Sequence, residues 1–317
     1  MATDQHKTDL TVRLAAPRGF CAGVERAVRT VEETLAVHGA PVYVRHEIVH
    51  NKHVVERLRA MGAIFVDHLD AIPDDRPVVF SAHGAPKSVH EEAEARNMVA
   101  IDATCPLVLK VHTQTRRYAA NKCHVYLVGH KNHPEVIGTM GQAPEGAVTL
   151  VETIADIENL PERDGRKAYA TQTTLSVDDA NAMVTALKQK FPDIIGPRKE
   201  DICYATSNRQ NAVKASAPDV DLFVVIGSNT SSNSKRLVEV AETAGAKRAV
   251  LIEDATCFDI SSINDATLIG VSAGASAPES LVEDLLTKLA ANRRLIIETV
   301  ETALEDVTFN TPLRLAS

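Results

Sequence analysis

Residues 12–39 read VRLAAPRGFCAGVERAVRTVEETLAVHG, and this stretch indicates the fold of the chain. It begins with an apolar run at 12–16, passes through a short glycine-containing turn, and continues into a longer segment at 22–39 whose apolar residues recur at helical spacing. A short β-rich run followed by an amphipathic helix is the first half of a βαβ unit, in which helices cover a parallel sheet. The sequence therefore predicts an α/β protein.

The same alternation of strand-like and helix-like runs continues along the chain. Strand-like runs follow at 41–46, 77–82, 124–130, 168–174, 221–228, 249–254 and 267–276, and helix-like runs at 51–62, 86–97, 176–191 and 231–245. We expect three similar α/β units with small, mainly parallel sheets, at residues 22–105, 106–199 and 200–292. The N-terminal strand at 10–21 is expected to join the third unit, and residues 293–317 to form a C-terminal tail.

Composition and charge favour a cytoplasmic protein that acts on a small partner rather than a nucleic acid. The 317 residues are 44% hydrophobic, enough for a buried site, and the net charge of −8 argues against a nucleic-acid partner. The polar N-terminus has no signal-peptide core, and no apolar window is long enough to span a bilayer, so we expect a cytoplasmic protein without a membrane partner. Five widely spaced cysteines predict reduced thiols or metal ligands rather than a disulfide framework.

Three of the cysteines share one local context. Cys21, Cys105 and Cys203 each stand where a strand-like run gives way to a helix-like run. The partial positive charge of a helix N-terminus favours the thiolate, which is the better nucleophile and metal ligand. Three separate buried thiols, a zinc site or an iron–sulfur cluster would all fit, and a cluster with only three cysteine ligands would keep one iron open for a substrate. Cys123 and Cys257 are interpreted as structural, with Cys257 a weaker alternative ligand.

The loops that follow the strand-like runs are rich in hydrogen-bond donors. In open α/β sheets the ligand site lies beyond the carboxyl ends of the strands, so these loops are the candidates for binding. Imidazoles, hydroxyls and helix N-termini together suit a diphosphate. The alternative is purely local, because Ser and Asn are preferred N-cap residues and a histidine can satisfy a nearby backbone group. The candidate binding residues are His50, His83, His133, Ser231, Ser232, Asn233 and Ser276.

A possible proton donor lies beside one of these histidines. Glu135 follows His133 by two residues, and Pro134 between them stiffens the loop. A carboxyl group next to a bound anion can act as a general acid, and the Thr173 hydroxyl could relay the proton. The alternatives are an ordinary first-turn glutamate favoured by the helix dipole and a threonine that belongs to an N-cap. The sequence contains neither GxGxxG nor GxxxxGK[ST], so these nucleotide-binding motifs give no support.

Taken together, these motifs resemble the LytB/IspH family, the 4-hydroxy-3-methylbut-2-enyl diphosphate reductases. Nine motifs occur in the family's order between about residue 11 and residue 290: PRGFCAGV (17–24), YVRHEIVHN (43–51), FSAHG (80–84), DATCPLV (102–108), GHKNHPEVIGTMGQ (129–142), TQTTLSVDD (171–179), GPRKEDICYATSNRQ (196–210), SSNSKRL (231–237) and AGASAP (273–278). The polar N-terminal extension and the segment after about residue 292 lie outside these motifs.

The resemblance implies a fold, a cofactor and a reaction. It implies three α/β units in a trefoil arrangement around a central [4Fe-4S] cluster held by Cys21, Cys105 and Cys203, whose unliganded iron takes the substrate hydroxyl as an alkoxide. Two single-electron transfers, with reduced ferredoxin or flavodoxin as donor, and protonation through Glu135 with Thr173 nearby, expel water and give isopentenyl and dimethylallyl diphosphate. The diphosphate is implied to contact His50, His83, His133, Thr173, Ser231, Ser232, Asn233 and Ser276.

Two other functions use the same residues. A zinc-dependent hydrolase would place Zn²⁺ among the cysteines and histidines, although their wide spacing gives no special support for zinc. A redox sensor would use a labile cluster to report oxygen or iron status, but it would need an output surface, and neither a helix-turn-helix nor a basic stripe is evident in the sequence.

Overall fold

The computed structural model describes residues 7–312 of the chain, which form two compact units. Unit 1 contains residues up to 21, residues 50–54 and residues 204–307, and unit 2 contains residues 22–49, 55–203 and those from 308. The first six residues of the polar N-terminal extension lie outside the described residues. Within residues 7–312, no helix is both long and apolar enough to cross a membrane.

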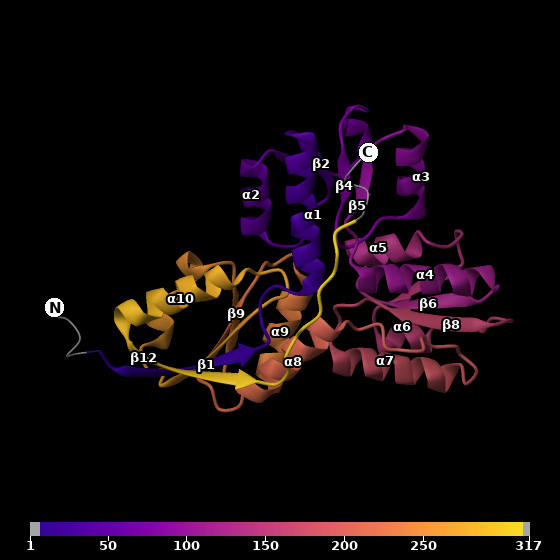
Figure 1. The fold of residues 1–317 in the computed structure, drawn as a ribbon. Helices are drawn as coiled ribbons and strands as arrows, with labels where there is room; N and C mark the ends of the chain where they lie inside the picture. Colours follow the sequence, from indigo (N-terminus) through magenta and orange to yellow (C-terminus); the bar gives the residue numbers. More distant parts are fainter. Residues whose placement is uncertain (1–6, 313–317) are drawn as a thin grey trace. The chain divides into compact units, whose positions relative to one another are not determined.

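Unit 1 is built on a five-stranded parallel sheet with the order β10-β9-β11-β1-β12. Its strands are β1 (Asp9–Ala16), β9 (Leu222–Ile226), β10 (Ala249–Ile252), β11 (Leu268–Ala273) and β12 (Arg294–Glu301), and its helices are α8 (Tyr204–Ser216), α9 (Ser232–Thr243) and α10 (Glu279–Asn292), with 3₁₀ turns η2 (Ala255–Cys257) and η3 (Ile260–Ile263). Residues 293–317 were predicted to form a C-terminal tail, but this segment begins with an edge strand, β12, which lies beside β1 (Figure 1).

The sheet of unit 1 is covered on both faces, and this explains its continuous apolar strands. All five residues of β9, LFVVI, are buried. Leu222, Val224 and Ile226 pack toward α10, whereas Phe223 and Val225 pack toward α8 and α9. Side chains alternate between the two faces of a strand, so a strand with helices on both sides needs apolar residues at every position.

Unit 2 contains two smaller parallel sheets. The first has the order β3-β2-β4-β5 and consists of β2 (Val42–Arg45), β3 (Ala63–Val66), β4 (Val78–Phe80) and β5 (Ala100–Asp102), with α1 (Ala22–His38), α2 (Lys52–Ala60), η1 (Leu69–Ala71) and α3 (Lys87–Ala95). The second has the order β7-β6-β8 and consists of β6 (His124–Val128), β7 (Val148–Val151) and β8 (Lys167–Thr171), with α4 (Pro106–Ala120), α5 (Pro134–Met140), α6 (Ile154–Glu158) and α7 (Val177–Lys190). The first turn of α2 is grouped with unit 1.

The predicted α/β class with small parallel sheets is confirmed. Every strand pair within residues 7–312 is parallel, and the strands form three sheets. In the β6 sheet, α4 and α5 pack on one face and α6 and α7 on the other. The division at 22–105, 106–199 and 200–292 stays a prediction. For the site, the important consequence is that the carboxyl ends of the strands in each sheet share one edge.

Candidate functional site

The three cysteines of interest all lie at the start of a helix. Cys21 directly precedes α1, Cys203 directly precedes α8, and Cys105 is the N-cap residue of α4, although its thiol does not cap that helix. All three are partly exposed, and none of the five cysteines forms a disulfide. The strand part of the prediction is wrong for Cys203, because the irregular segment 191–203 precedes it, whereas Cys21 and Cys105 follow β1 and β5 closely. The helix N-termini, which favour thiolates, are present in all three cases.

The backbone N–H of each cysteine is bound to a loop that carries a predicted substrate residue. In unit 1, Cys21 donates to the carbonyl of Ala275, next to Ser276, over 3.3 Å. In unit 2, Cys105 donates to the carbonyl of Ala82, next to His83, over 3.0 Å. Also in unit 2, Cys203 donates to the carbonyl of Thr173 over 3.1 Å. A backbone hydrogen bond therefore holds each cysteine close to a candidate binding or proton-transfer residue of its own unit.

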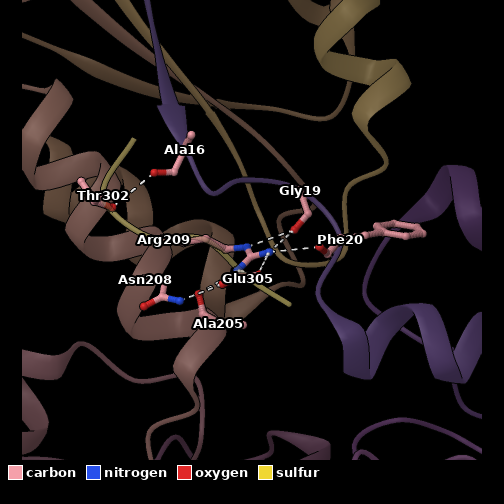
Figure 2. A network of polar contacts seen from close by, with 8 residues as sticks. All are labelled: Ala16, Gly19, Phe20, Ala205, Asn208, Arg209, Thr302 and Glu305. Carbon is pink, nitrogen blue, oxygen red and sulfur yellow. Dashed lines mark hydrogen bonds and ion pairs between the residues drawn. The ribbon is translucent and has the colours of Figure 1, made fainter. Parts of the chain in front are cut away.

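The turn before Cys21 is fastened by a buried ion pair (Figure 2). Arg209, on α8, is 0% exposed, and its guanidinium donates to the carbonyls of Gly19 and Phe20 at 2.8 to 3.1 Å. Its charge is balanced by Glu305, with atoms 3.0 Å apart. Gly19 itself has φ +67°, a conformation that side-chain-bearing residues rarely adopt. The position of Cys21 thus depends on contacts from α8 and from the segment after β12.

Glu135 and Thr173 are in direct contact in unit 2. Glu135 is 2% exposed in the first turn of α5, and its carboxylate accepts from the Thr173 N–H at 2.6 Å and from the Thr173 hydroxyl at 2.9 Å. Burial raises the pKa of Glu135 to about 7, while the two hydrogen bonds from Thr173 pull it down and the nearby Asp201 adds to the rise. A carboxyl group that holds its proton near neutral pH suits general acid catalysis.

The His133 ring has a local role that also fixes its tautomer. His133 is the N-cap of α5, where its Nδ1 accepts from the Glu135 N–H over 3.2 Å. That hydrogen bond requires an unprotonated Nδ1, so Nε2 carries the proton of the neutral ring. The ring of His83 lies edge-on to it, with centroids 5.9 Å apart, and the Ser81 hydroxyl is 3.4 Å from His83 Nδ1. The local capping interpretation therefore holds for His133.

Unit 1 contributes hydroxyls, amides and a helix N-terminus. Ser231 is the N-cap of α9, where its hydroxyl oxygen accepts from the Ser234 N–H over 3.2 Å, and half-buried Ser232 opens the helix. Asn233 is 4% exposed, and neither its Nδ2 nor its Oδ1 has a hydrogen-bond partner among residues 7–312. Burying an amide without hydrogen-bond partners costs folding free energy, so the unpartnered Asn233 side chain indicates that a polar ligand binds here.

Ser276 and His50 are also brought together in unit 1. The Ser276 hydroxyl donates to the carbonyl of His50 over 2.9 Å, which uses its proton within the protein. The structure thus links the two residues, and the Ser276 lone pairs stay available as acceptors. In this arrangement Ser276 positions the His50 segment.

Comparison with known proteins supports the family membership that the motifs indicate. The family described as LytB protein matches residues 12–290. The chain belongs to the LytB protein family. A 4-hydroxy-3-methylbut-2-enyl diphosphate reductase of Hyphomonas neptunium is 58% identical over 311 residues, covering 98% of this chain and 99% of the relative. One of Ruegeria pomeroyi with the same name is 57% identical over 307 residues, covering 96% and 97%.

Solved structures agree with this assignment to the LytB family. The E-1-hydroxy-2-methyl-but-2-enyl-4-diphosphate reductase from Plasmodium falciparum is 37% identical, with a TM-score of 0.91 over 98% of this chain and 96% of that one. A second structure, of (E)-4-hydroxy-3-methyl-but-2-enyl diphosphate reductase, the terminal enzyme of the non-mevalonate pathway, is 32% identical with a TM-score of 0.63, over 89% of this chain and 99% of that one. The resemblance inferred from the nine motifs is confirmed.

Sequence reasoning missed two buried residues that support the loops of candidate residues in unit 2. His112, on α4, packs against the loop of His83, where a Cβ on Gly84 (φ +81°) would come within 2.5 Å of its ring. Burial lowers the pKa of His112 to about 4, so the ring is neutral. Gln172 joins two loops, since its Oε1 accepts from the His130 N–H over 3.0 Å and its Nε2 donates to the Thr174 hydroxyl over 2.8 Å. The only feature of the sequence that could have indicated these roles is that Gln172 directly precedes Thr173.

The two remaining cysteines differ from the other three. Cys123 is buried just before β6, and Cys257 is exposed in η2. Within residues 7–312, no three or more His, Cys, Asp or Glu side chains form a group that could hold a metal ion. Cys21 belongs to unit 1, and Cys105 and Cys203 belong to unit 2, so neither unit by itself contains all three candidate ligands.

Proposed function

We propose that this protein is a 4-hydroxy-3-methylbut-2-enyl diphosphate reductase, the terminal enzyme of the non-mevalonate isoprenoid route. It removes the hydroxyl group of (E)-4-hydroxy-3-methylbut-2-enyl diphosphate with two electrons and two protons, releasing water and either isopentenyl or dimethylallyl diphosphate. Relatives that are 57–58% identical over almost the whole chain have this name. The observation that carries the proposal is the backbone link from each of three cysteines to a candidate substrate loop.

The donor set fits an iron–sulfur cluster. Cys21, Cys105 and Cys203 supply three partly exposed thiols at helix N-termini, and thiolates are the usual ligands of such clusters. We propose that these three residues hold a [4Fe-4S] cluster. When bound, the cluster supplies the electrons one at a time and an iron without a protein ligand at which the substrate hydroxyl can be held. All other steps fall to the protein side chains.

The side chains bind the diphosphate and move the proton. The Nε2–H of His133, the Asn233 amide and the N-terminus of α9 donate to the anion, together with His50, His83 and Ser232. Ser276 positions the His50 segment through its hydrogen bond to the His50 carbonyl. Glu135, protonated near neutral pH, delivers a proton to the departing hydroxyl, and the Thr173 hydroxyl holds its carboxylate in place. Reduced ferredoxin or flavodoxin delivers the electrons, and the reaction takes place in the cytoplasm.

Replacement of one cysteine tests this function. Cys105→Ser is expected to remove most of the iron and acid-labile sulfide and to abolish turnover of the diphosphate, while circular dichroism shows a folded protein. Cys257→Ser, which changes an exposed cysteine in η2, is the matched control and should retain both. Unchanged iron content in Cys105→Ser would contradict the three-ligand assignment. Zinc in place of iron and sulfide in the wild-type protein would favour the hydrolase instead.

The wild-type protein also gives a direct readout of substrate binding. Addition of the diphosphate should change the electron paramagnetic resonance spectrum of the reduced protein, because the substrate hydroxyl is expected at the cluster. A spectrum insensitive to substrate, together with normal cluster content, would support the redox sensor rather than the reductase.

A further inference from the structure

Unit 2 contains a basic groove that plays no part in the site described above. The groove has a volume of about 770 Å³ and runs along one side of α4, between that helix and residues 195–199. Its charged lining residues are all cations: Lys110, Arg117, Arg166, Arg198 and Lys199. No carboxylate from the described part of the chain lines it, although the net charge of the whole chain is −8. We call these five residues and the cavity between them the α4 groove.

Most of the charge of the α4 groove is not neutralised. Lys110 is paired with the buried carboxylate of Asp201 over 3.1 Å. Within residues 7–312, the other four cations form no ion pair with a carboxylate, and all four are exposed. Uncompensated charges of one sign in a concave surface produce a local potential that attracts anions. The α4 groove therefore carries a positive local potential.

Both walls of the α4 groove lead to proposed cluster ligands. One wall is α4, which begins directly after Cys105, and groove residue Leu109 donates its N–H to the Cys105 carbonyl over 2.9 Å. The other wall ends at Lys199, four residues before Cys203. The two walls are tied together, because the Lys110 ammonium donates to the Lys199 carbonyl at 2.8 Å and to the Glu200 carbonyl at 2.7 Å. One end of the groove is thus about one helical turn from Cys105.

We propose that the α4 groove is the docking site for a small acidic protein that carries single electrons. This inference rests on the proposed function, which consumes two electrons delivered singly. A carrier docked here would sit against the segments that hold Cys105 and Cys203. Transient redox complexes have small interfaces, and complementary charge raises their association rate and fixes their orientation. A groove with four unneutralised cations beside the Lys110–Asp201 pair provides that charge.

The test reverses charge on the two walls and compares two electron donors. Arg117 and Arg198 lie on opposite walls, and neither side chain makes a hydrogen bond or ion pair within the described residues. The double variant Arg117→Glu/Arg198→Glu of the cluster-loaded enzyme is assayed for diphosphate turnover with reduced flavodoxin, an acidic carrier, and with a reduced viologen dye, which needs no docking site. Lys87→Glu, on α3 of the same unit, is the control for a charge reversal outside the groove.

We expect kcat/KM for flavodoxin to fall at least about tenfold in the double variant, while the viologen-driven rate and the iron content stay at the wild-type level. Raising the ionic strength should slow the wild-type flavodoxin reaction and have little effect on the double variant. Lys87→Glu should keep the flavodoxin rate within about twofold of wild type. A flavodoxin with two surface carboxylates changed to lysine should recover part of the lost rate with the double variant.

Other results would overturn the docking proposal. An unchanged flavodoxin rate in the double variant would exclude this surface, and an equal fall with both donors would show damage to the enzyme rather than loss of docking. Loss of binding to a single-stranded RNA oligonucleotide, with both donor rates unchanged, would assign the groove to nucleic acid instead. If wild-type enzyme does not turn over the diphosphate even with the viologen, the proposed function fails, and the two failures are thereby distinguished.

Discussion

Unit 1 and unit 2 carry candidate residues of different chemistry. The unit 2 residues can exchange a proton: Glu135 has a pKa raised to about 7 by burial, and the adjacent His133 has its tautomer fixed by the backbone. The unit 1 residues are mainly neutral donors, namely the N-terminus of α9 with the buried Asn233 amide. Neutral, preorganised donors bind an anion at any pH, whereas a buried carboxyl can act only while protonated. In the proposed reaction, proton delivery therefore falls to unit 2 and much of the diphosphate binding to unit 1.

The strongest test of the unit 2 role is Glu135→Gln. Glutamine keeps the shape and can still accept from the Thr173 N–H, but it cannot deliver a proton. Loss of general acid catalysis is expected to lower kcat by about 10²- to 10⁴-fold, with KM and the cluster spectrum little changed. Steady-state kinetics and iron analysis measure both quantities. A kcat within threefold of wild type would remove Glu135 from the role of proton donor.

The same substitution should make the protein more stable than wild type as the pH rises. Because the folded pKa of Glu135 lies near 7, above the ordinary value of 4.5, the folded state holds the proton more tightly than the unfolded state. The associated stability is complete below pH 4.5 and is lost as the pH rises through 7, about 3 kcal/mol in total. Glu135→Gln has no such loss, so its thermal midpoint relative to wild type should increase between pH 5 and pH 8.

The largest stability effect is expected in unit 1, at Glu305→Gln. This change leaves the fully buried Arg209 charge without its carboxylate, and an unpaired buried charge costs about 3–5 kcal/mol of unfolding free energy. The control is Glu279→Gln, which breaks the Arg18–Glu279 pair beside the same turn; Glu279 is 46% exposed, so the cost should be under about 1 kcal/mol. Chemical denaturation compares the two, and equal losses would show that Arg209 does not depend on Glu305.

Local patterns predicted much of the fold, and long-range pairings could not be predicted. Strand and helix periodicities are read within short windows, so the parallel α/β class and the helix starts after Cys21, Cys105 and Cys203 follow from sequence. The Arg209–Glu305 pair joins residues 96 apart and has no local signature. The irregular segment before Cys203 was also missed. Cys203 is followed by a helix, as Cys21 and Cys105 are, but no strand directly precedes it.

Asn233→Ala tests the anion-binding role of unit 1. If the buried amide donates to the diphosphate, its removal should raise KM by about 10- to 100-fold, as for a hydrogen bond to a charged group, with kcat nearly unchanged. The increase should be the same at pH 6 and pH 8, because an amide does not titrate. The control is Asn292→Ala, because the Asn292 Nδ2 donates to a helix carbonyl at the end of α10. An increase in KM that depends on pH would contradict the proposal that unit 1 binds the anion through groups that do not titrate.

Thr173→Val tests how unit 2 tunes its carboxyl group. The Thr173 hydroxyl donates to Glu135 and so lowers the pKa of that residue, against the effect of burial. Removing the hydroxyl should raise the pKa, and the alkaline limb of the kcat profile should move to higher pH, by about one unit for a hydrogen bond worth about 1.5 kcal/mol. Thr173→Ser, which keeps the hydroxyl, should restore the wild-type limb. A profile that stays in place would leave Thr173 with a packing role only.

The smallest expected effect separates helix capping from substrate binding. The Ser231 oxygen accepts from the Ser234 N–H, which leaves the hydroxyl hydrogen able to donate to the diphosphate. Ser231→Ala should therefore lower the unfolding free energy by about 1 kcal/mol and also raise KM several-fold. Thr153→Ala removes a comparable cap, from the Asp156 N–H at the start of α6, and should lower stability alone. If KM rises in neither variant, Ser231 only caps α9, and anion binding in unit 1 depends on Asn233 and the backbone of that helix.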